Sequence, residues 1–345
     1  LRISAPIGWC LVAGSLVELF FAYRLPVTKA ASAALRFEWR PYIRGDYLRN
    51  NLSLIWRNDV IWLSIVGLSV FWAIAQVVLA SFPPFTKEEM GITNTIVIQG
   101  LMACAGIGIM LGSSMAVSAS KNHIETGLIP IGAVGVAATI IVLPALQSPI
   151  ALGVNFVALG FLGGLFIVPL NALIQYHADE NERGRVLAGN NLVQNTTMLL
   201  FLGMTIGLAA LEKDSRFIFG MLAVAACAGA FYTVYKVPES LVRFLVNQLF
   251  SSKYRLQIVG FEKFPKSGGV LLLGNHISWI DWAIVQMSSP RPVRFIMERS
   301  IYERWYLKWF LDFFGCIPIS AGAYNKAFEQ VSELLNRGEV VCLFP

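Results

Sequence analysis

A histidine and an aspartate five positions apart are the residues of this chain best suited to catalysis. His276 and Asp281 lie in the segment 274–281, whose sequence is GNHISWID. An aspartate that holds one imidazole nitrogen as N–H leaves the other nitrogen free to take a proton from a hydroxyl group. This is the logic of a Ser-His-Asp triad in which the alcohol of a substrate replaces the serine. The pair therefore predicts transfer of a group to a substrate alcohol.

The elements around the pair follow from the pattern of apolar residues. Residues 270–273 predict a short buried strand, 275–278 a turn, and 279–287 a helix. A turn entering a helix can bring Asp281 back to the imidazole of His276. Further strands are expected at 254–259, 293–297, 316–320 and 339–344, and further helices at 300–313 and 324–337. Alternating strands and helices predict an α/β domain with a partly parallel sheet.

Three sequence blocks in this region resemble the glycerolipid acyltransferases. Residues 275–281 resemble the first block of that family, 314–319 (FGCIPI) the second, and 340–345 (VVCLFP) the start of the Phe-Pro-Glu-Gly block. The resemblance implies that His276 and Asp281 are catalytic. It also implies substrate binding by residues of the three blocks: Asn275, Ser278, Gly315, Ile317, Pro318, Phe344 and Pro345. Amides at the start of the helix near Ser278 are expected to stabilise an oxyanion.

The second block departs from the family pattern. The family often places a phosphate-binding arginine shortly after this block, but here Ile319 is followed by serine and alanine. Arg294, Arg299 and Arg304 are therefore the candidates for the phosphate of a substrate, and their alternative role is solubility. The Glu-Gly expected after the third block lies beyond Pro345.

The composition predicts a membrane protein. Of the 345 residues, 56% are hydrophobic and 14% are charged, which is too apolar for a soluble chain of this length. Seven basic residues cluster after the first apolar span: Arg24, Lys29, Arg36, Arg40, Arg44, Arg49 and Arg57. Such a cluster marks the cytoplasmic side and lies against anionic lipids rather than nucleic acid. The five scattered cysteines predict neither disulfides nor a metal site.

Seven apolar stretches have about the 20 residues needed to cross a bilayer. They lie at 5–23, 60–82, 93–117, 128–146, 150–170, 190–210 and 217–235. Most loop arginines fall in the connections 24–57, 118–127 and 171–189, so these connections are predicted to be cytoplasmic. Everything after residue 236 is then cytoplasmic as well.

The loops in this region resemble the major facilitator superfamily. The run 169–175 (PLNALIQ), followed by 182–191, is similar to the bacterial lysophospholipid transporter branch. The resemblance implies that residues 1–236 form transmembrane helices 6 to 12, with a central cytoplasmic loop at 24–57. Polar residues in apolar spans are candidates for the transport path: Gln76, Asn171, Gln175 and Asn195. Their alternative role is hydrogen bonding within or between helices.

A short segment joins the two parts. Residues 237–251 predict a linker and an amphipathic helix, which lies on the membrane surface or packs on the acyltransferase core. The predicted fold is an α-helical membrane bundle (1–236), this segment, and a partial α/β glycerolipid acyltransferase domain (252–345).

Together the two resemblances imply a fusion that imports a lysophospholipid, lysophosphatidylethanolamine above all, and acylates it again. The acyl donor would be acyl-[acyl carrier protein] or acyl-CoA, with no bound cofactor and no metal. The partners are acyl carrier protein and membrane lipids, and the place is the bacterial inner membrane. Two alternatives stay open: a transporter with a non-catalytic domain, and a membrane-anchored 1-acylglycerol-3-phosphate acyltransferase. Because the family patterns extend beyond Leu1 and Pro345, we expect residues 1–345 alone to lack both activities.

Overall fold

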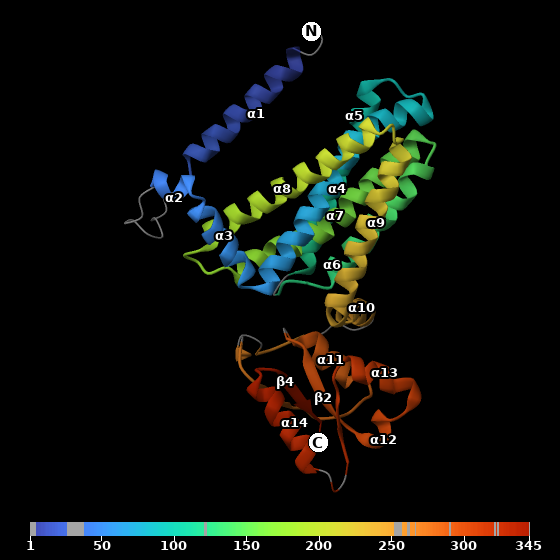
Figure 1. The fold of residues 1–345 in the computed structure, drawn as a ribbon. Helices are drawn as coiled ribbons and strands as arrows, with labels where there is room; N and C mark the ends of the chain where they lie inside the picture. Colours follow the sequence, from blue (N-terminus) through green and yellow to red (C-terminus); the bar gives the residue numbers. More distant parts are fainter. Residues whose placement is uncertain are drawn as a thin grey trace.

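The computed structural model describes residues 5–25, 38–120, 123–251, 257–260, 263–265, 267–289, 291–320, 322 and 324–344. A bundle of long helices leads through one crosswise helix into a small α/β domain (Figure 1). This arrangement confirms the predicted fold class.

Six helical segments of the described chain are long and apolar enough to cross a membrane. They are α4 (Asp59–Met90), α5 (Thr95–Ala119), α6 (Leu128–Val142) with η1 (Leu143–Ala145), α7 (Pro149–His177), α8 (Arg183–Ala210) and α9 (Ser215–Lys236). The first predicted span forms α1 (Ala5–Tyr23), whose apolar part Val12–Tyr23 is shorter than the other six. The predicted loop at 24–57 contains α2 (Trp39–Ile43) and α3 (Asp46–Trp56), and α3 packs against α8.

Local sequence signals fix the ends of these helices. The Asn58 side chain accepts hydrogen bonds from the amides of Val60 (2.9 Å) and Ile61 (3.2 Å), which caps the start of α4. Gly91 ends the same helix in the left-handed conformation with φ 66°. Asp214 caps α9 by accepting from the amide of Phe217 at 2.9 Å.

Small residues bring α5 and α7 into close contact. A Cβ atom added at Gly112 would overlap the Phe161 carbonyl, and one added at Gly160 would overlap the Ala105 carbonyl. Such glycines let two backbones approach in a membrane, where packing rather than the hydrophobic effect drives helix association.

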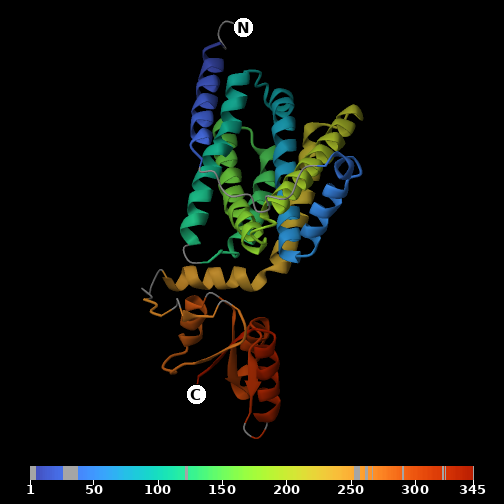
Figure 2. The same cartoon turned by 90° about the vertical axis from the view of Figure 1, so that its left-hand side faces the viewer.

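Helix α10 (Pro238–Ser251) runs across the end of the bundle, between the bundle and the α/β domain (Figure 2). Phe244 packs against residues of the bundle, and Val242 packs against the core of the α/β domain. Leu245 and Leu249 remain exposed. The helix therefore contacts the core of the α/β domain and also presents an apolar surface, so it has features of both predicted roles.

The α/β domain is a four-stranded sheet with strand order β1-β4-β2-β3, and every described pair is parallel. Its elements are β1 (Val270–Leu273), α11 (Asp281–Ser288), β2 (Val293–Glu298), α12 (Arg299–Tyr302), α13 (Trp305–Phe313), β3 (Ile317–Ile319), α14 (Tyr324–Asn336) and β4 (Val340–Leu343). The helix predicted at 300–313 is two helices. Of the strand predicted at 254–259, residues 254–256 lie outside the described chain and 257–259 form no strand.

Alternate strand residues face two separate cores. Val340 and Cys342 point into a core formed with α10, α11 and α13, whereas Val341 points into a core formed with α14. This alternation is the period of two expected of a strand. Both faces of the sheet are covered, as a parallel sheet requires.

Candidate active site

His276 and Asp281 meet in the loop between β1 and α11. The Nδ1 atom of His276 lies 2.9 Å from Oδ2 of Asp281. The imidazole is half exposed, whereas 16% of the aspartate side chain is accessible. The structure therefore brings together the two residues that the sequence selected, with the carboxylate sheltered and the ring open to an incoming molecule.

Asp281 also organises the turn that carries His276. The same Oδ2 atom accepts hydrogen bonds from the amides of Ile277 (2.7 Å) and Ser278 (2.8 Å). These backbone hydrogen bonds, from Ser278 and then Ile277, lower the pKa of Asp281, and the contact with His276 adds to the effect. The carboxylate is thus ionised at neutral pH. The amides of Ile277 and Ser278 are both directed to Asp281. That other amides near Ser278 stabilise an oxyanion stays a prediction.

An ionised carboxylate at Nδ1 favours the tautomer of His276 with its proton on that atom. Nε2 is then the nitrogen that accepts a proton. The opposite side of the site is aromatic: the His276 ring stacks on Phe344, with centroids 5.1 Å apart, and Phe344 stacks on Phe295 at 6.0 Å. A Cβ atom at Gly274 would lie 2.9 Å from the Phe344 ring. Phe344, predicted to bind substrate, thus supports the imidazole directly.

Because the strands are parallel, the residues that follow them all lie along the side of the sheet where the strands have their carboxyl ends. His276 follows β1, Arg299 follows β2, and Phe344 follows β4. Ligands of open parallel sheets bind at this carboxyl edge. Exposed apolar side chains flank the histidine there, with Ile277 84% and Trp279 64% accessible. Asn275 and Ser278 are exposed on the same loop.

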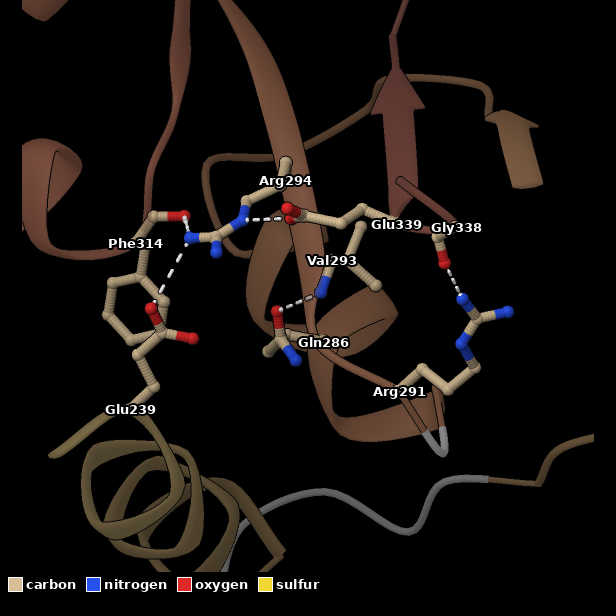
Figure 3. Close-up of polar contacts among 8 residues, drawn as sticks. All are labelled: Glu239, Gln286, Arg291, Val293, Arg294, Phe314, Gly338 and Glu339. Carbon is tan, nitrogen blue, oxygen red and sulfur yellow. Dashed lines mark hydrogen bonds and ion pairs between the residues drawn. The ribbon is translucent and has the colours of Figure 1, made fainter. Parts of the chain in front are cut away.

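Arg294 lies at the opposite end of the strands from His276, at the amino end of β2 (Figure 3). Its Nε donates to Glu339 at 2.8 Å, and its Nη1 donates to the Phe314 carbonyl at 3.0 Å and to Glu239 of α10 at 3.3 Å. Burial alone would lower the pKa of Arg294, but the contacts with Glu339 and Glu239 outweigh it and raise the pKa. This arginine ties α10 to the sheet and lies away from His276.

The second sequence block adjoins this arginine. Gly315 has φ +59°, and a Cβ atom there would overlap the Arg294 guanidinium, so this position requires glycine. Ile317 is buried beneath α14, and Pro318 pairs with Met297 in the sheet. These contacts stabilise the fold, and they fix the register of β3 against β2.

The other predicted binding residues are placed as follows. Arg299 is exposed and pairs with Glu303 at 3.2 Å, and Arg304 donates to the Tyr306 hydroxyl at 3.1 Å. Of the candidate arginines, Arg299 lies at the carboxyl ends of the strands, as His276 does. Pro345 lies outside the described residues.

In the bundle, two of the predicted transport residues bind their own helices. Asn171 donates to the Ile167 carbonyl at 3.0 Å, and Asn195, which is exposed, donates to the Asn191 carbonyl at 2.7 Å. Gln76 is half-buried on α4 and Gln175 is exposed on α7. None of these four lines a cavity of about 340 Å³ that lies between α4, α6, α7 and α9. Sequence reasoning followed polar residues and missed this cavity, because its walls are apolar.

Comparison with known proteins gives two matching families. The model of the family described as "Acyltransferase" matches residues 255–345, and that of the Major Facilitator Superfamily matches residues 4–202. No solved structure matches the chain significantly.

Relatives matching this chain include proteins named lysophospholipid transporter LplT. The protein from Enterobacter sp. (strain 638) is 30% identical over 207 residues, which are 59% of this chain and 50% of the relative. The protein from Yersinia enterocolitica is 31% identical over 52% of this chain and 44% of its own length, and that from Escherichia coli O157:H7 is 31% identical over 52% and 45%. The chain thus spans about half the length of the curated relatives it matches. Because the superfamily model covers more than half of its residues, the chain belongs to the Major Facilitator Superfamily.

Proposed function

We propose that the α/β domain transfers an acyl group from a carrier thioester to the free glycerol hydroxyl of a lysophospholipid. The observation that carries the proposal is the His276–Asp281 pair, joined at 2.9 Å within the acyltransferase match. The pair stands at the carboxyl edge of a parallel sheet, with the imidazole exposed. Its geometry is that of a general base oriented by a carboxylate.

The chemistry follows from this geometry. Nε2 of His276 takes the proton of the glycerol hydroxyl as its oxygen attacks the thioester carbonyl carbon. The carbon–sulfur bond then breaks, a new ester forms, and the imidazolium returns its proton to the thiolate that leaves. Asp281, ionised throughout, stabilises the imidazolium from the Nδ1 side. Ile277 and Trp279 are exposed apolar residues of the same loop and could contact the acyl chain of the donor.

We infer that the helical bundle is part of a transporter that brings the lysophospholipid to this domain. The support is the superfamily match and the relatives named as lysophospholipid transporters. Helix α10 contacts both parts, so an enzyme tethered there would work at a raised local substrate concentration. Helix α3, which belongs to the predicted cytoplasmic connection, lies toward the end of the bundle that faces α10 (Figure 1), which favours a cytoplasmic position for the α/β domain in a bacterial inner membrane.

The test uses the gene product with its natural flanking sequence, reconstituted in liposomes. Labelled acyl-[acyl carrier protein] and acyl-CoA are offered as donors, and lysophosphatidylethanolamine and lysophosphatidic acid as acceptors. We expect a diacyl product from lysophosphatidylethanolamine. Product from lysophosphatidic acid alone would favour an enzyme of phosphatidate synthesis, and no product with either acceptor would contradict acyl transfer.

A further inference from the structure

The cavity in the helical bundle has almost entirely apolar walls. Valine, leucine, isoleucine, phenylalanine, alanine and glycine of α4, α6, α7 and α9 form most of its lining. Phe71, Phe166 and Leu170 lie among the wall residues, and they also pack in the main core of the bundle. Its volume of about 340 Å³ is at the lower end of the ~300–1,000 Å³ typical of ligand sites. Such walls exclude polar ligand groups and suit a hydrocarbon chain.

The cavity is elongated along the bundle. Its lining on α4 extends from Val60 to Ile74, a rise of about 21 Å at 1.5 Å per residue. One leaflet of a bilayer has a hydrocarbon depth of about 15 Å, half of the ~30 Å core. The cavity is therefore long enough for the acyl chain of a lipid from one leaflet.

Polar groups line the cavity at one end only. Lys236, the last residue of α9, and Tyr232, one turn before it, both belong to the lining. The Lys236 ammonium lies 5.8 Å from the centre of the Tyr232 ring. This end also contains Val60, near the start of α4, and adjoins α10. A lysine and a tyrosine at a helix end are suited to the level of the lipid headgroups.

We propose that this cavity binds one single-chain phospholipid, with its acyl chain between α4, α6, α7 and α9 and its phosphate on Lys236. The proposal rests on the proposed function and gives the transported lipid a site in the bundle. Charge complementarity selects the headgroup, because an ammonium at the mouth of an apolar cavity favours an anionic phosphate over a neutral glyceride. The small volume selects one chain over two.

Two glycines of α9 provide a matched pair of variants. Gly229 lines the cavity, and a Cβ atom added there would have no neighbour within 4 Å, so Gly229→Trp fills the cavity without a clash at Cβ. Gly220 on the same helix is exposed, is equally free of neighbours and lies outside the cavity. In the full gene product, we expect Gly229→Trp to weaken lysophosphatidylethanolamine binding at least tenfold and Gly220→Trp to leave it unchanged. Equal binding by both variants would overturn the proposal.

A photoreactive lysophosphatidylethanolamine, with a diazirine on its acyl chain, locates the site directly. We expect labelled peptides from the segments that line the cavity on α4, α6, α7 and α9. Labelling confined to other parts of the chain, or equal labelling by a two-chain probe, would overturn the proposal. Lys236→Gln should remove the preference for the lysophospholipid over monoacylglycerol, whereas Lys236→Arg should keep it. An unchanged preference in Lys236→Gln would contradict the phosphate contact.

If the wild-type protein is labelled in the cavity but imports no lysophospholipid, the transport function fails while the site stands. If it imports lysophospholipid without labelling there, the site fails alone.

Discussion

The imidazole of His276 and the phenyl ring of Phe344 stack on each other, with centroids 5.1 Å apart and planes inclined by 24°. One residue follows β1 and the other follows β4, and these two strands are neighbours in the sheet. The imidazole is therefore held by the carboxylate of Asp281 at Nδ1 and by an aromatic ring against its face.

Replacing Phe344 with Ala should loosen the imidazole without removing it. An aromatic pair contributes about 0.5–1.5 kcal/mol beyond its area burial, so we expect kcat to fall about tenfold with a smaller change in KM. Phe344→Tyr keeps the stacked face and serves as the control. Steady-state acylation assays of the two variants check this, and an Ala variant with wild-type kcat would show that the stacking has no part in catalysis.

Replacing Asp281 with Asn removes the charge that orients His276 and stabilises its protonated form. We expect acyl transfer to fall by about 10²–10⁴-fold, the usual contribution of a positioned general base. Lipid import, measured in the same vesicles, should be unchanged because Asp281 lies in the α/β domain. Loss of both activities would instead indicate that the substitution damages the fold.

The same carboxylate makes the turn at 276–281 sensitive to acid. Because the pKa of Asp281 is lowered below 3.8 in the folded chain, its hydrogen bonds stabilise the turn above that value. This stabilisation disappears as the pH falls through the lowered pKa. Hydrogen exchange should therefore show the Ile277 and Ser278 amides protected at pH 5–7 in the wild type and less protected in Asp281→Ala. Equal protection in the two proteins would contradict the hydrogen bonds to Oδ2.

Replacement by Gln should lower the stability of the protein at Arg294 but leave it almost unchanged at Arg299. Arg294→Gln leaves Glu239 and Glu339 without their cation, so we expect the free energy of unfolding to fall by about 1.5–3 kcal/mol. Arg299→Gln loses one exposed ion pair, and its stability should change by about 0.5 kcal/mol or less. If Arg299 binds the substrate phosphate, this variant raises KM for the acceptor. Thermal unfolding and acceptor titration separate the two effects, and a stable Arg294→Gln with a raised KM would reverse the assignment.

Helix packing in the bundle gives a further contrast. Gly112→Ala places a methyl group against the Phe161 carbonyl, and such overpacking costs about 1–3 kcal/mol. Gly106→Ala on the same helix meets no atom within 4 Å and should keep or slightly raise stability. Thermal unfolding in detergent checks the difference, and equal midpoints would argue against the close approach of α5 and α7.

Much of this architecture follows from local patterns in the sequence. The apolar spans, the strand at 270–273 and the pairing of His276 with Asp281 each depend on residues near one another in the chain. The helix after the pair begins at Asp281 rather than at residue 279, because the Asp281 side chain binds the amides of the preceding turn. A hydrogen bond of this kind depends on a side-chain rotamer that periodicity does not reveal.

Long-range features could not be predicted in this way. The order β1-β4-β2-β3 makes β1 and β4 neighbours and so places Phe344 beside His276, and no local pattern specifies which strands are neighbours. A search for polar residues in apolar spans likewise selected Asn171 and Asn195, which bind their own helix backbones. The cavity that ends at Lys236 is built from apolar residues of four helices, so only their packing reveals it.

The most direct test of the central claim is acyl transfer by the full gene product carrying His276→Ala, with lysophospholipid import measured in the same proteoliposomes. The account predicts that acyl transfer falls by about 10²-fold or more while import continues. Acyl transfer at the wild-type rate in this variant would contradict the role of His276 as the general base.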